Sequence, residues 1–141
     1  AIGQQSFEVY IFGTIKAVIN PPQIKTMAKK IIKIEGLAIF LTCLYFYSKL
    51  DASWLLFVLF WLLPDISMIG YFKNIKLGAI LYNFVHNYIL VLIIIIIGLW
   101  QRNNLIISLG VILASHIGLD RFFGYGLKYL TGFKDTHIQK L

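Results

Sequence analysis

Cysteine and charged residues are both scarce in this sequence. Cys43 is the only cysteine, so the chain can form no internal disulfide and no cysteine-rich zinc cluster. Asp, Glu, Lys and Arg together make up only 13% of the 141 residues. The sequence also lacks a glycine-rich phosphate loop and a basic nucleic-acid-binding motif. These absences argue against a nucleotide-binding enzyme and against nucleic acid as a partner.

Hydrophobic residues dominate what is present. They make up 59% of the chain, and the mean hydropathy is +0.79, far above that of a soluble globular domain. A helix needs about 20 residues to cross a bilayer, within a range of roughly 17 to 25. Four apolar stretches suit that role: residues 34–49, 53–72, 77–100 and 105–127. The sequence therefore predicts an all-α integral membrane bundle of four transmembrane helices.

The first 26 residues do not fit this plan. Their apolar part, residues 7–19, is too short to span a bilayer and is followed by Pro21 and Pro22, which interrupt a helix. We therefore divide the chain into an N-terminal extension, residues 1–26, and a transmembrane domain, residues 27–141. An interfacial helix is the first interpretation of the extension.

Basic residues are distributed unequally between the predicted loops. With four spans both termini lie on one side, and that side carries eleven of the thirteen basic residues: Lys16, Lys25, Lys29, Lys30, Lys33, Lys73, Lys76, Arg121, Lys128, Lys134 and Lys140. Cytoplasmic loops carry such an excess. We therefore predict a multi-pass protein of the cell inner (cytoplasmic) membrane with both termini cytoplasmic. Its basic collar would bind anionic lipid headgroups, with about 1 kcal/mol per basic residue near the surface.

Four ionisable residues lie inside the apolar stretches: Asp65, His86, His116 and Asp120. A central Asp costs about 2.5 to 3.5 kcal/mol on insertion scales, so such residues usually have partners and mark function. The depth of each residue follows from the number of residues that separate it from the nearest basic loop residue, because a helix rises about 1.5 Å per residue. On this basis all four are predicted about 12 to 18 Å below the cytoplasmic edge. Residues from three predicted helices therefore converge on one depth.

The helical spacing of these residues suits a metal ion. His116 and Asp120 are four residues apart, as are Tyr82 and His86, so each pair shares a helix face. Imidazole and carboxylate ligands hold zinc, iron or manganese in the cores of helix bundles. Two alternatives stay open. The residues form only a hydrogen-bonded structural network, or they relay protons or ions.

Other polar residues are predicted near the cytoplasmic side. Glu35 is predicted at the mouth of the site, as a ligand, a general base or a partner of Lys33. Residues 124–129 combine glycines with interfacial tyrosines, for which membrane anchoring is the simpler interpretation. Residues 135–137 are predicted as a solvated tail, and folding over the site is the alternative.

Several motifs occur together in order. They are residues 34–37, 64–71, 82–86, 116–121, 124–129 and 135–137. From residue 27 onward, the chain resembles a family of small bacterial membrane proteins of unknown function on these motifs. That resemblance implies a membrane protein and supplies no activity.

A more distant similarity is to membrane-bound metal-dependent hydrolases, which carry Leu-Pro-Asp-x-Asp, then His-Arg-x-x-Thr-His-Ser, then Ser-His-x-x-x-Asp. Residues 63–65 and 115–120 match the first and last of these motifs. Ser67 replaces the second Asp, and residues 83–86 keep only one of the two central histidines. The similarity implies metal-dependent hydrolysis with a smaller set of ligands.

We therefore predict metal-assisted hydrolysis of a lipid-like or phosphate-bearing substrate at the cytoplasmic side. Asp65, His86, His116 and Asp120 would hold a divalent zinc, manganese or iron ion, which lowers the pKa of a bound water. Glu35 and Asp65 are the candidate catalytic groups. The competing hypotheses are a non-enzymatic accessory subunit of a larger membrane complex and an ion- or proton-conducting protein. Self-association into a homo-oligomer is compatible with each.

Overall fold

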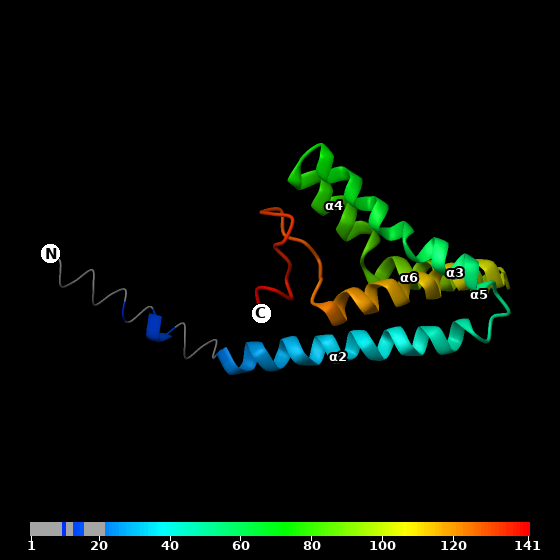
Figure 1. Ribbon diagram of the computed structural model, residues 1–141, viewed down its shortest axis with the longest axis horizontal. Helices are drawn as coiled ribbons and strands as arrows, with labels where there is room; N and C mark the ends of the chain where they lie inside the picture. Colours follow the sequence, from blue (N-terminus) through cyan, green and yellow to red (C-terminus); the bar gives the residue numbers. More distant parts are fainter. Residues whose placement is uncertain (1–9, 11–12, 16–21) are drawn as a thin grey trace.

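The computed structural model describes residues 10, 13–15 and 22–141. The predicted interfacial helix within residues 1–26 therefore falls mostly outside the described residues. Six helical elements follow one another along the chain (Figure 1): α2 (Pro22–Tyr47), α3 (Trp54–Trp61), the 3-10 helix η1 (Leu63–Phe72), α4 (Ile75–Val85), α5 (Tyr88–Trp100) and α6 (Asn104–Phe123). The all-α prediction is confirmed for this part of the chain.

Three helical segments are long and apolar enough to cross a membrane: Trp54–Phe72, Ile75–Trp100 and Asn104–Phe123. The helix α2 has 26 residues, which is ample length. Its last 18 residues, 30–47, nevertheless include Lys30, Lys33 and Glu35, so its charge sets it apart from the other three. Length and composition of the described residues are thus consistent with a membrane protein that has three candidate spanning helices.

The second predicted span is two helices with different geometries. Pro64 has no N–H to donate, and its ring excludes the carbonyl group four residues earlier from an α-helical position. The α-helix α3 accordingly ends at Trp61, and the chain continues as η1 for ten residues, which is long for a 3-10 helix. In this geometry residues three apart lie directly above one another. Asp65 and Met68 therefore share one side of η1.

The third predicted span is broken at His86 and Asn87. His86 ends α4 with backbone angles of φ −92° and ψ 41°. The Asn87 side chain accepts a hydrogen bond from the Leu90 N–H at 3.0 Å and donates one to the Asn83 carbonyl at 2.9 Å. A polar side chain thus satisfies backbone groups that a break inside a membrane would otherwise leave unpaired.

The central element is α6, which runs antiparallel to α2 (Figure 1). Its middle is almost wholly buried, over residues 110–118. A Cβ atom added to Gly36 of α2 would lie 2.5 Å from the Gly118 carbonyl oxygen. The two backbones therefore touch at this pair of glycines, as in membrane helix pairs that cross at small residues. This contact fixes the part of α6 that carries His116 and Asp120.

The C-terminal segment, residues 124–141, folds back over the bundle. Gly124 has φ +95° and ends α6 in the left-handed conformation that glycine adopts readily. The Asn83 side chain then donates to the Lys128 carbonyl at 2.8 Å and accepts from the Lys128 N–H at 2.7 Å. Thr136 and Ile138 are buried. The predicted helix to residue 127 and the predicted solvated tail at 135–137 are therefore both wrong.

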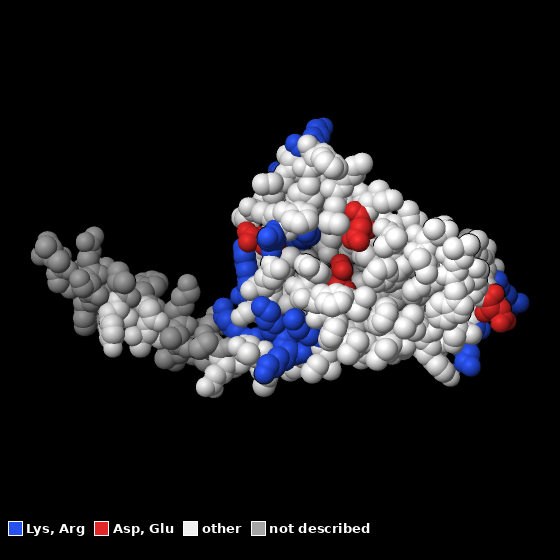
Figure 2. All heavy atoms as spheres, in the orientation of Figure 1, with Lys and Arg blue, Asp and Glu red and all other residues white. Residues whose placement is uncertain are grey.

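The charges gather toward one end of the molecule. Figure 2 shows Lys and Arg atoms concentrated at the end from which α2 starts and at the tip of the hairpin formed by η1 and α4. A smaller group of charges marks the opposite end, where the α2–α3 and α5–α6 loops carry Lys49, Asp51 and Arg102. Most of the surface between these ends is uncharged, as lipid contact requires.

Candidate metal centre

Of the four ionisable residues singled out in the sequence, Asp65, His86 and His116 place ligand atoms close enough together to hold one metal ion, and Asp120 lies beside the two histidines. The two imidazole Nε2 atoms of His86 and His116 are 3.2 Å apart. Asp65 Oδ1 lies 3.7 Å from the first and 3.6 Å from the second. Asp120 Oδ2 lies 3.8 Å from both. Three elements supply these atoms: η1, the end of α4, and α6.

The two Nε2 atoms are within hydrogen-bond distance of each other, whereas the distances to the carboxylates are compatible with ligands that share one ion. The nitrogen–oxygen distances of 3.6 to 3.8 Å are too long for hydrogen bonds. A point equidistant from Asp65 Oδ1 and the two Nε2 atoms lies about 2.0 Å from each, which matches zinc–nitrogen and zinc–oxygen bonds of about 2.0 to 2.2 Å. The side chains present therefore fit a small divalent ion.

Tyr82 positions two members of the cluster. Its carbonyl oxygen lies 3.0 Å from His86 Nδ1, and since a carbonyl only accepts, Nδ1 carries the proton and a neutral ring leaves Nε2 free to bind a cation. Its ring stacks on the His86 ring with centroids 3.7 Å apart. Its hydroxyl donates to Asp120 Oδ2 at 3.0 Å. Such outer contacts are typical of metal-binding histidines and carboxylates.

The two histidines of the cluster are buried, whereas its two carboxylates are partly exposed. The imidazoles are almost inaccessible, with side-chain exposures of 3% for His86 and 2% for His116. His116 also packs edge-on against Trp61, with ring centroids 4.9 Å apart. The Asp65 and Asp120 side chains are 43% and 23% exposed. A substrate would thus approach from the carboxylate side.

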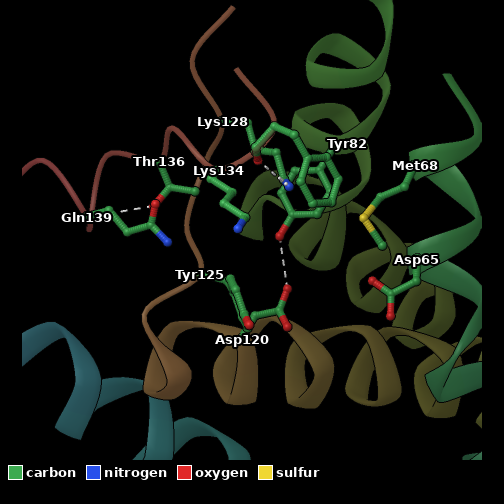
Figure 3. A pocket seen from close by; sticks show the side chains of 10 residues that line it. Asp65, Met68, Tyr82, Asp120, Tyr125, Lys128, Lys134, Thr136 and Gln139 are labelled. Atoms are coloured by element: carbon green, nitrogen blue, oxygen red, sulfur yellow. Dashed lines mark hydrogen bonds between the residues drawn. The ribbon is translucent and has the colours of Figure 1, made fainter. Parts of the chain in front are cut away.

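A pocket of about 470 Å³ opens on that side, which is within the usual range for a small-molecule site. Figure 3 shows Asp65 and Met68 on one flank, Asp120 at the base with the Tyr82 hydroxyl directed at it, and the C-terminal segment on the other flank. That segment contributes Tyr125, Lys128, Phe133, Lys134, Thr136 and Gln139. An apolar groove along η1, lined by Ile66, Ile69, Tyr71, Phe72 and Phe133, adjoins it through Asp65 and Met68.

Lys128 is the residue of this site whose role the sequence did not reveal. It is only 9% exposed, and its ammonium group donates to the Phe133 carbonyl at 2.9 Å. The same group lies 3.7 Å from the ring centroid of Phe133 and 4.7 Å from that of Tyr82. Burial lowers the pKa of Lys128, although the negative charges of Asp120 and Asp65 act in the opposite direction. The only signal in the sequence was its place within the 124–129 motif.

Glu35 is not part of this arrangement. It is exposed on α2, beside the contact between Gly36 and α6, and it does not line the pocket that holds Asp65 and Asp120. Its role as ligand or general base stays a prediction from sequence. Arg121 points away from its neighbour Asp120, as the helical spacing predicted, and its guanidinium lies 4.3 Å from the centroid of the Tyr88 ring.

Comparison with known proteins gives one match. A family model described as a domain of unknown function, DUF4260, matches residues 29–141. Neither the curated proteins nor the solved structures give a significant match to the chain. The match agrees with the family of unknown function that the motifs indicated, whereas no similarity to a hydrolase is found.

Proposed function

We propose, for a chain that belongs to the DUF4260 family of domains of unknown function, that it is a membrane-embedded metal-dependent hydrolase. Its substrate is lipid-like or phosphate-bearing and enters from the cytoplasmic side. The observation that carries the proposal is the spacing of Asp65, His86 and His116, whose ligand atoms surround a point about 2.0 Å from each, the bond length of a zinc site.

The histidines and aspartates of the cluster have different roles in this proposal. His86 and His116 form a rigid wall, because Tyr82 and Trp61 pack against their rings. Asp65 and Asp120 supply the negative charge that a cation needs. A bound zinc, manganese or iron ion would activate water and polarise a carbonyl or phosphoryl oxygen. Asp65, the more exposed carboxylate, would help to hold the ion and would act as the general base that accepts a proton from water.

We further propose that α2 is a fourth transmembrane helix. Its 26 residues extend about 39 Å at 1.5 Å per residue, longer than the 30 Å hydrocarbon core. Lys25 and Lys29 would then lie at the cytoplasmic headgroups, where anionic lipids attract them. Lys30 and Lys33 would reach the same headgroups by extending their side chains, which leaves residues 30–47, about 27 Å long, to cross the core. In this topology both termini are cytoplasmic in the inner membrane.

Cysteine labelling in whole cells tests the topology. In a Cys43→Ser background, we expect a membrane-impermeant thiol reagent to label Asn104→Cys, at the start of α6. It should leave Leu141→Cys unlabelled until the cells are permeabilised. Both positions are exposed in the fold, so only the membrane decides access. Labelling of Leu141→Cys alone would invert the proposed orientation, and labelling of both in intact cells would contradict four spans.

Hydrolysis by the purified protein tests the activity. We expect turnover of a phosphate ester or a carboxylic ester presented in mixed micelles, abolished by chelator and reduced at least about 100-fold by Asp65→Asn. Asp51→Asn is the matched control. Asp51 lies in the exposed loop at the other end of the molecule with φ +49°, a conformation that Asn tolerates. Metal binding without hydrolysis of either ester would favour the accessory-subunit hypothesis.

A further inference from the structure

The pocket that contains the carboxylates has a second, oppositely charged wall. Lys128 and Lys134 both line it, and both come from the C-terminal segment. Figure 3 shows their side chains on the flank opposite Asp65, with Thr136 and Gln139 beside them. A negatively charged wall and a positively charged wall thus face one another across a single cavity.

The burial of Lys128 requires an explanation. An ammonium group has three N–H donors, and the structure records one hydrogen bond for it, to the Phe133 carbonyl. The Phe133 and Tyr82 rings attract the same charge, so the group is held in place at the pocket wall. The backbone of Lys128 is fixed independently by Asn83. The structure therefore presents a preorganised cation at the wall of the pocket.

Lys134 complements this fixed cation. It is exposed at the pocket wall, so its side chain is free to follow a ligand. Two positive charges with several N–H donors suit a phosphate group, which carries up to two negative charges and accepts several charge-assisted hydrogen bonds. A carboxylic ester is uncharged and would gain nothing from these residues.

We infer that Lys128 and Lys134 form the phosphate-binding subsite of the proposed hydrolase and select a phosphate ester as its substrate. The inference rests on the proposed function, because the Asp65 and Asp120 carboxylates on the opposite wall weaken the binding of an anion unless a cation lies beside them. With that cation present, the phosphate group lies between positive charges on both sides. The C-terminal segment then acts in substrate recognition rather than as a membrane anchor.

The phosphate group could belong to a membrane lipid or to a soluble ester. The apolar groove that adjoins the pocket, with Ile66, Ile69 and Phe133 in its lining, would take the acyl chain of a lipid. A soluble ester would leave this groove empty. The chemistry recognised by the lysines is the same in both cases, so the two sources are separated by experiment.

Calorimetric titration of the detergent-purified protein, whose metal content is measured beforehand, tests the inference without relying on turnover. Inorganic phosphate and dihexanoyl phosphatidic acid are the two probes. We expect both to bind wild type. Affinity should fall about tenfold in Lys134→Gln and more in Lys128→Met, as the loss of a charge-assisted contact predicts. Lys73→Gln, an exposed lysine outside the pocket, should bind like wild type.

The outcomes separate the inference from the proposed function. Metal-loaded protein that binds no phosphate, or that binds it equally well in Lys134→Gln, would overturn the subsite. Protein without metal would contradict the proposed function, while a loss of phosphate affinity specific to the pocket lysines would still support the subsite. If Lys128→Met does not fold, Lys134→Gln against Lys73→Gln decides alone. Tighter binding of the phosphatidic acid than of inorganic phosphate would indicate a lipid substrate, and equal affinities a soluble one.

Discussion

Protein purified without chelator is expected to contain about one divalent ion per chain, and the His116→Ala variant to contain almost none. The reason is geometric: His116 Nε2 lies within 3.8 Å of every other candidate ligand atom in the cluster, so its removal opens the coordination sphere. Loss of one ligand from such a site weakens metal binding by several orders of magnitude. Elemental analysis of both proteins, normalised to protein concentration, measures the effect.

The control for this experiment is His137→Ala. This histidine lies in the C-terminal segment outside the cluster, so the variant should keep its metal. Since His116 is buried, the alanine variant also leaves a cavity, and His116→Gln preserves more of the volume if the alanine variant fails to fold. Wild type that holds no metal, even after incubation with zinc, manganese or iron, would exclude the metal centre.

Chelator is expected to lower the melting temperature of wild type in detergent by roughly 5 to 10 °C and to leave Asp65→Asn unchanged. An ion at 100 times its dissociation constant stabilises the folded state by about 2.7 kcal/mol, which for a chain of this size corresponds to a shift of that order. The amide of Asn keeps the shape of Asp65 but loses the charge that a cation requires.

The structural-network hypothesis predicts a different result for the same four samples. If no ion is bound, Asp65→Asn merely removes a charge from the membrane, so its melting temperature should equal or exceed that of wild type whether or not chelator is present. Asp51→Asn controls for the loss of a carboxylate elsewhere in the chain. Four coincident melting curves would exclude a stabilising ion, and the four side chains would then serve only to hold the helices together.

The sequence predicted the positions of the site residues better than the shapes of the elements that carry them. Basic loop residues and the rise of a helix predicted Asp65, His86, His116 and Asp120 at similar depths, and the structure brings Asp65, His86 and His116 together with Asp120 beside the two histidines. Depth depends only on the distance to the nearest loop, so a break within a helix changes it little. The side chains can therefore come together although two of the three predicted helices are interrupted.

The sequence indicated these two helix interruptions to different degrees. Pro64 marked a possible break, but ten residues of 3-10 helix depend on how η1 packs against α4, which no local pattern encodes. The break at His86 had a weaker signal, because Asn87 resembled a polar residue inside a helix. Only the structure identifies it as the side chain that caps α5 through the Leu90 N–H.

The sequence by itself indicated an all-α chain with apolar helices long enough to cross a membrane and an excess of positive charge at one end. These properties follow from composition and from the fixed dimensions of helix and bilayer. The tertiary structure alone decided that the C-terminal segment forms one wall of the site and that Glu35 lies outside it. The reason is distance along the chain: Lys128 is held by Asn83, 45 positions away, and contacts of that range arise from packing rather than from local periodicity.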